Sequence, residues 1–183
     1  MRVSKEKAAE NRDKILKATA RLIRERGISG AGVDALTEAA GMTHGSLYSQ
    51  FGSKERLIEE ALDYMAASAR QRTGGAATVA AYVANYLSGS HRDSPGSGCP
   101  FAALCSEIPH QSSSVRARFT DGLRGMMSQL SSRISPTLMQ KQRDEQALAI
   151  VASLVGALVL SRAVNDPKLS DDILRATKRR LES

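Results

Sequence analysis

Features that define several other classes of protein are scarce in this chain of 183 residues. Its only cysteines are Cys99 and Cys105, and the five residues between them match neither a CxxC pair nor a zinc-finger spacing. The longest apolar run covers 14 residues, 147–160, and is interrupted by Ser153 and Gly156, so it is short of the ~20 needed to cross a bilayer. Residues 1–12 contain no apolar secretory segment. We therefore expect a cytoplasmic protein with no membrane span and no disulfide.

Arrangements that support catalysis are also missing. We find no Ser-His-Asp set, carboxylate pair or phosphate-binding glycine loop in a suitable context. His91 and His110 have no partner at metal-ligand spacing. We therefore expect a protein that is not an enzyme and that holds neither a metal nor a cofactor.

Positive charge, by contrast, is plentiful and concentrated. The net charge is +7, and residues 1–26 carry nine basic and four acidic side chains, whereas the rest of the chain is nearly balanced. A basic end on a balanced chain favours a polyanionic partner, although a solvated helix face has the same composition.

Apolar residues recur at helical spacing along the whole chain, and no strand pattern interrupts them. This periodicity predicts helices over residues 11–26, 33–40, 43–51, 53–72, 76–87, 99–108, 114–134, 141–164 and 170–181. Residues 88–98 are rich in Gly, Ser and Pro and are predicted to form a flexible surface loop. The helix at 141–164 is apolar on nearly every side, so a second copy of the chain is needed to cover one face.

The stretch GMTHGSLYSQFGSK, residues 41–54, has the composition of a helix-turn-helix reading element, with a glycine turn before a short polar helix. Leu47 and Phe51, four residues apart, face inward and hold this helix from behind. Lys54 stands at the start of the next helix, where an ammonium and free backbone N–H groups both favour an anion. We expect contacts to DNA from six residues of this stretch: Thr43, His44, Gly45, Ser46, Tyr48 and Lys54.

These motifs resemble the DNA-binding domain of the TetR family of bacterial transcriptional regulators. The family pattern is matched by Ala-Ala-Gly at 39–41, Gly-Ser-Leu-Tyr-Ser-Gln-Phe at 45–51 and Ser-Lys-Glu-Arg-Leu at 53–57. The resemblance implies groove contacts from residues 43–46 and phosphate contacts from Tyr48 and Lys54. Three positions depart from the family pattern: Gly32 replaces a capping Ser or Thr, Thr37 replaces a small apolar residue, and His44 replaces a frequent Lys or Arg.

The resemblance also implies the organisation of the whole chain. We predict an all-α homodimer with a three-helix DNA-binding domain at 1–52 and a larger ligand-binding domain at 53–183 that dimerises through its last two helices. The expected function is a repressor that a small molecule releases from a palindromic double-stranded DNA operator. Two alternatives are a helical binding module of the same fold that does not bind DNA, and a small-molecule enzyme built in the larger domain.

Candidate ligand contacts in the larger domain are the apolar residues Cys99, Phe101, Leu104, Phe119, Met126 and Met127, although residues of this kind at helical spacing more often form an ordinary core. Arg116, Arg118 and Glu107 are candidate polar contacts or plain surface charges. Cys99 begins a helix, and a helix N-terminus lowers a thiol pKa. The Gly-Cys pair at 98–99 resembles regulators related to the electrophile-responsive N-ethylmaleimide repressor, so Cys99 is either a sensor or a small buried hydrophobe.

Overall fold

The computed structural model describes residues 5–73 and 75–182, and over these residues the fold is helical with no strand, which confirms the predicted all-α class. The elements are α1 (Lys5–Gly30), α2 (Val33–Ala40), α3 (His44–Phe51), α4 (Lys54–Thr73), α5 (Val79–Tyr86), α6 (Gly89–Arg92), α7 (Pro100–Leu104), α8 (Ser113–Ser131), α9 (Gln140–Ala163) and α10 (Pro167–Glu182), with short 3₁₀ helices η1 (Pro95–Ser97) and η2 (Ile108–His110).

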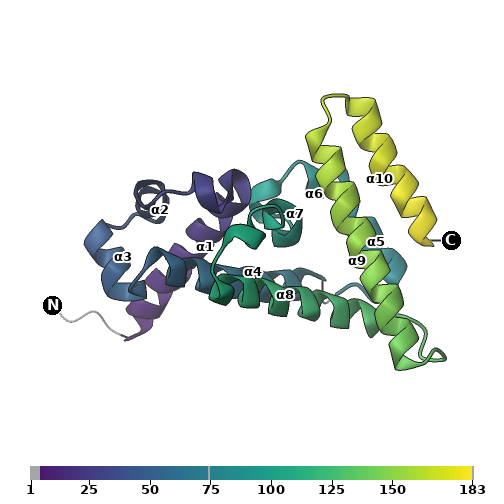
Figure 1. The fold of residues 1–183 in the computed structure, drawn as a ribbon, viewed down its shortest axis with the longest axis horizontal. Helices are drawn as coiled ribbons and strands as arrows, with labels where there is room; N and C mark the ends of the chain where they lie inside the picture. Colours follow the sequence, from purple (N-terminus) through teal and green to yellow (C-terminus); the bar gives the residue numbers. More distant parts are fainter. Residues whose placement is uncertain (1–4, 74, 183) are drawn as a thin grey trace.

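The molecule is elongated, and the helices predicted to read DNA lie at the opposite end from those predicted to form the dimer (Figure 1). Helices α2 and α3 lie at one end, and the paired helices α9 and α10 lie at the other. Between them α4 packs against both α1 and α8, so one long helix connects the two ends.

Glycines and hydroxyl caps set the ends of the N-terminal helices where the sequence predicted them. Gly27 interrupts α1 with φ 76° and ψ 169°, Gly41 ends α2 with φ 62°, and Gly52 ends α3 with φ 78°. Only glycine adopts such backbone without strain. Thr43 accepts the Ser46 N–H at 3.2 Å and so caps α3.

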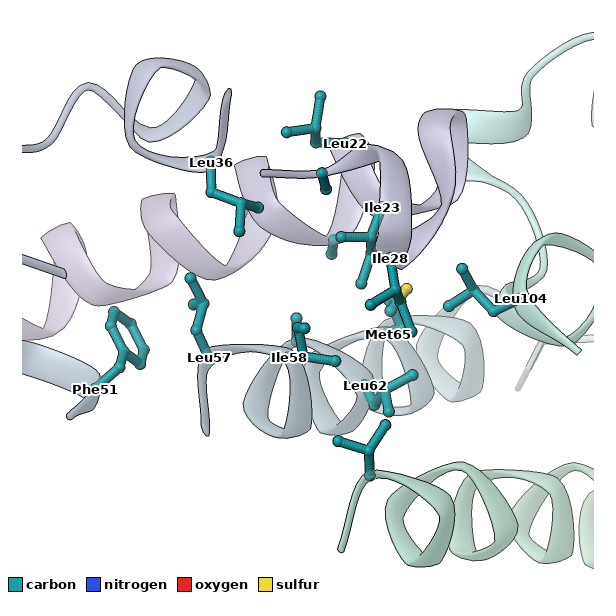
Figure 2. Close-up of a cluster of buried hydrophobic side chains, with 14 of the residues drawn as sticks. Leu22, Ile23, Ile28, Leu36, Phe51, Leu57, Ile58, Leu62, Met65 and Leu104 are labelled. Atoms are coloured by element: carbon teal, nitrogen blue, oxygen red, sulfur yellow. The ribbon is translucent and has the colours of Figure 1, made fainter. Parts of the chain in front are cut away.

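Two apolar cores stabilise the fold. Figure 2 shows part of the first, in which side chains of α1 and α4 meet between the two helices and Leu104 of α7 reaches the same cluster. The second core joins α5, α7, α8, α9 and α10. The domain boundary at residue 52 stays a prediction, because α4 supplies much of the first core while it also packs on α8.

The prediction of a flexible loop at residues 88–98 is wrong. The segment contains α6 and η1, and Gly96 is buried against α1. Arg24 of α1 donates to the Gly96 carbonyl, and Arg162 of α9 donates to the carbonyls of His91 and Arg92 at 2.7 and 2.9 Å. Backbone groups of the segment are therefore satisfied by arginines about 70 positions away, a pairing that local composition cannot reveal.

Several predicted helix ends also differ from the structure: α1 begins at Lys5 rather than at residue 11, α5 begins at Val79 rather than at residue 76, and α8 ends at Ser131 rather than at residue 134. The helix predicted at 99–108 ends at Leu104, and Pro109 lies inside η2 rather than stopping a helix. The last helix begins at Pro167, three residues before the predicted start, because proline lacks only an N–H that the first helical position does not use.

Candidate DNA interface and ligand cavity

Helix α3 presents one face to the core and the other to solvent. Leu47 is 0% exposed and Phe51 is 5% exposed, whereas Tyr48, between them, is 51% exposed. Of the six residues predicted to contact DNA, Thr43, His44, Gly45 and Tyr48 are exposed, and Ser46 and Lys54 are half-buried. This arrangement leaves a polar strip at the end of the molecule, held from behind by two apolar anchors.

Arg12 of α1 fixes the position of α3, a role that no local sequence pattern indicates. Its guanidinium lies 4.3 Å above the Phe51 ring, donates to the Gln50 carbonyl at 3.0 Å and pairs with the Glu60 carboxylate of α4. In the sequence Arg12 is only one of the basic residues of α1, because its partners Gln50 and Glu60 stand 38 and 48 positions away.

The positions that depart from the TetR pattern have distinct surroundings. His44 Nε2 lies 2.7 Å from the Asp34 carboxylate, so α2 and the start of α3 are joined at the exposed tip. Thr37 is buried, and its hydroxyl donates within α2 to the carbonyls of Val33 and Asp34. Gly32 starts α2 without a side-chain cap, as its lack of a side chain requires.

Lys54 stands at the first position of α4, where the Ser53 hydroxyl accepts the Arg56 N–H at 3.0 Å. Its Nζ donates to the Ile28 carbonyl at 3.4 Å. This hydrogen bond links the first residue of α4 to the end of α1.

A cavity of about 560 Å³ lies in the larger part of the chain, between α4, α5, α7, α8 and the segment 88–98. Among the predicted ligand contacts, Cys99, Phe101 and Met126 line it. Leu104 lies instead in the first core, Phe119 packs edge-on against Phe101 with ring centroids 5.1 Å apart, and Met127 packs in the second core.

The polar groups of the cavity differ from the predicted ones. Arg70, Arg72, Tyr86 and His91 line it together with several serines. Glu107, a predicted polar contact, accepts the backbone N–H groups of Ile28 and Ser29 at 3.2 and 2.8 Å instead. The cavity arginines come from the last turn of α4, which sequence reasoning treated only as the end of a helix.

The His91 side chain links α5 to the start of α7 in the cavity wall. Its Nδ1 donates to the Tyr86 carbonyl at 2.7 Å, its Nε2 accepts the Cys99 N–H at 3.0 Å, and its ring meets the Tyr86 ring edge-on with centroids 4.7 Å apart. Both nitrogens are thus used in the neutral form, and burial lowers the pKa of His91.

Cys99 stands at the N-terminus of α7, as the sequence predicted. Its pKa is nevertheless not lowered in the way that a helix N-terminus would favour. The thiol is buried, and burial raises its pKa more than the neighbouring donors lower it. Cys105 is exposed. Among the described residues no group of three metal-ligand side chains is placed to hold an ion.

The fold is that of a helix-turn-helix DNA-binding regulator, with a separate cavity in the larger part of the chain. A family model described as bacterial regulatory proteins, tetR family, matches residues 15–61, and one described as tetracyclin repressor-like, C-terminal domain, matches residues 75–177. The chain belongs to the TetR family of transcriptional regulators.

Named relatives agree with this assignment. The HTH-type transcriptional repressor KstR2 of Mycolicibacterium smegmatis is 39% identical over 54 residues, which span 30% of this chain and only 26% of that protein. The HTH-type transcriptional regulator Rv0196 of Mycobacterium tuberculosis is 27% identical over 168 residues, 85% of this chain and 86% of that protein.

Solved structures share the fold over nearly the whole chain. The reduced form of NemR from E. coli matches with a TM-score of 0.80 at 22% identity, covering 94% of this chain and 95% of that one. A TetR-family regulator from Cytophaga hutchinsonii matches with a TM-score of 0.78 at 21% identity, covering 100% and 97%.

Proposed function

We propose that this protein is a homodimeric repressor that binds a palindromic operator through α3 and releases it when a small molecule fills the cavity. The observation that carries the proposal is the position of residues 88–98. Ser94, Ser97 and His91 line the cavity, while Gly96, in the same segment, is held by Arg24 of α1. A ligand that shifts the cavity wall therefore acts directly on the helix that positions α3.

The DNA contacts proposed for α3 follow from exposure and charge. Residues 43–46 form a thin tip that fits a major groove, and Tyr48 and Lys54 flank it where phosphates run. In a dimer, the two tips would enter successive major grooves about 34 to 36 Å apart. Ligand binding favours a dimer shape in which this separation no longer matches the operator.

The dimer contact proposed here is the outer face of α9, together with α10. By length and composition α9 could cross a membrane, but it buries seven residues, six of which belong to the second core. On its other face Leu148 is 50% and Leu160 is 56% exposed, and Ala152 between them is also exposed. An apolar strip of this length is stabilised by a second copy of the same strip.

The proposed DNA contacts are tested by binding to the DNA upstream of the protein's own gene at several salt concentrations. Tyr48→Phe and Lys54→Ala should each weaken binding, and the logarithmic salt slope should fall by about one unit for the lost Lys54 contact. Arg124→Ala is the matched control, since Arg124 is exposed on α8, away from both the proposed DNA contacts and the proposed dimer face.

The alternative of a helical binding module gives a different result in the same assay. A module of this fold that has lost DNA binding would show no shift of upstream DNA with the unmodified chain. Unchanged affinity and slope in both variants would mean that the assigned contacts are wrong. A regulator of this kind acts where the chromosome is, so the proposal includes a cytoplasmic location and no catalytic role.

A further inference from the structure

The charges around the cavity are unbalanced. Arg70 and Arg72 line it, and among its described lining residues there is no aspartate or glutamate. Neither arginine has an ion-pair partner within the described part of the chain. The Arg70 guanidinium lies along α8, where a Cβ on Gly125 would be 3.3 Å from its Nη1. Two unpaired guanidinium groups at the edge of a cavity favour an anionic guest.

Other positive charge adds to this imbalance. The pKa of Arg24 is lowered to about 10, mainly by burial and secondly by the positive charge of Arg72. Arg72 therefore lies close enough to a second guanidinium to be repelled by it. An anion bound at Arg72 would relieve that repulsion, which strengthens its binding.

The second observation is a buried hydroxyl with no partner. Tyr86 is 7% exposed and lines the cavity, and its Oη makes no hydrogen bond of acceptable geometry among the described residues. The Cys99 thiol is near enough to affect the pKa of both groups, but it does not satisfy the hydroxyl. A buried donor left without an acceptor is costly, so a guest that offers one is favoured.

Part of the remaining wall is apolar. Phe101, Met126 and Ala66 line it. At Gly122 of α8, also in the lining, a Cβ would lie 3.5 Å from the Phe101 ring and 3.6 Å from the Ala66 methyl, so any larger side chain there would narrow the space. A cavity of about 560 Å³ is the size that holds a drug-sized molecule.

We infer that the ligand is a small organic acid: its carboxylate pairs with Arg70 and Arg72, its apolar body lies on Phe101 and Met126, and an acceptor atom receives the Tyr86 hydroxyl. This inference rests on the proposed function in one respect only: binding of the acid regulates transcription only if a filled cavity releases the DNA. Binding of the acid is a separate measurement from release of DNA.

The test compares each acid with its uncharged counterpart on the full-length protein. The probes are 4-hydroxycinnamate with 4-hydroxycinnamamide, and decanoate with decanamide, measured by calorimetry and by thermal shift. We expect at least one acid to bind at least tenfold more tightly than its amide and to raise the Tm by mass action. Equal binding of acid and amide in both pairs, or binding of neither acid at 10-fold molar excess over 1 mM protein, overturns the inference.

Variants locate the contacts. Arg70→Gln combined with Arg72→Gln should weaken the acid about tenfold or more and leave the amide unchanged, whereas Arg124→Gln should leave both unchanged, because Arg124 is exposed on α8 and pairs with Asp121. Tyr86→Phe should weaken the acid by several-fold while the ligand-free Tm stays level or rises, since an unsatisfied buried hydroxyl is removed.

The two proposals fail in distinguishable ways. If an acid binds with the expected variant pattern but the upstream DNA stays bound, the ligand class stands and release by ligand fails. If only an uncharged or cationic compound releases the DNA, release stands and the organic-acid inference fails. If the double arginine variant binds acid as tightly as the unmodified chain, the anion site is wrong whatever the DNA does.

Discussion

The joint between α1 and the larger part of the chain gives a prediction whose size can be worked from the structure. At Gly27 the backbone has φ 76° and ψ 169°, a region that only glycine occupies without strain. The Glu107 carboxylate fills the space beside it and accepts the N–H groups of Ile28 and Ser29 at 3.2 and 2.8 Å. The Glu107 carboxylate thus caps N–H groups beside the break in α1, although Glu107 stands 79 positions beyond Ile28 in the chain.

Two substitutions should destabilise the protein through the same bonds. Glu107→Ala removes two charge-assisted hydrogen bonds, one of them exposed, and should cost about 2–4 kcal/mol. Gly27→Ala adds about 1–3 kcal/mol of backbone strain. Its Cβ would also lie 2.9 Å from the Glu107 Cδ, which displaces the carboxylate, so this variant loses the same hydrogen bonds.

A double-mutant cycle separates these terms. Because the hydrogen bonds can be lost only once, the double variant should be more stable than the sum of the single effects by about 2 kcal/mol. The assay is urea unfolding of the four proteins. Thermal unfolding of the same proteins should show Tm differences of about 4–8 °C for 2 kcal/mol in a domain of this size. Glu107→Gln, which keeps an acceptor oxygen, should lose less than Glu107→Ala. Strictly additive effects would refute the reasoning, since they would mean that the Gly27 Cβ does not displace the carboxylate.

Three further predictions concern reactivity, pH and assembly. In single-cysteine variants N-ethylmaleimide should label the exposed Cys105 of the folded protein at least tenfold faster than the buried Cys99, whose pKa is raised, and equal rates by mass spectrometry would contradict this. Burial lowers the His91 pKa below 6.5, so the unfolded chain binds more protons. Stability should therefore fall as pH drops below about 6.5, and His91→Gln should flatten the fall of Tm between pH 7.5 and 5.5; an identical pH profile would sink the idea. Leu148→Glu with Leu160→Glu should give monomers in light scattering without loss of helical signal, and a persistent dimer would place the contact elsewhere.

The DNA-reading element could be predicted from the sequence because its determinants are local. Gly41 and Gly52 end helices through their own backbone freedom, and Thr43 caps α3 through a bond three residues along. Leu47 and Phe51 face inward because they stand four positions apart on one helix. Each of these signals lies within one turn of the chain, where composition and spacing suffice.

The cavity could be predicted only in part, for the opposite reason. Helical spacing marked Phe101 and Met126 as inward-facing, but it marked Leu104 in the same way, and Leu104 faces α1 and α4 (Figure 2). Periodicity gives the direction of a side chain on its own helix and says nothing of what lies opposite. The exposed arginines of α4 were missed because a polar lining has no periodic signal.

The largest error, at residues 88–98, falls on the segment with the greatest consequence for the proposed mechanism. Glycine, serine and proline in that stretch indicate a loop when the chain is read locally, whereas Arg24 and Arg162 bind carbonyls of the segment from two distant helices. A segment with weak local preference and strong long-range contacts can change its position when those contacts change. The segment borders the cavity on one side and α1 on the other. Its dependence on long-range contacts makes its structure hard to predict locally, and a ligand-driven switch needs the same dependence.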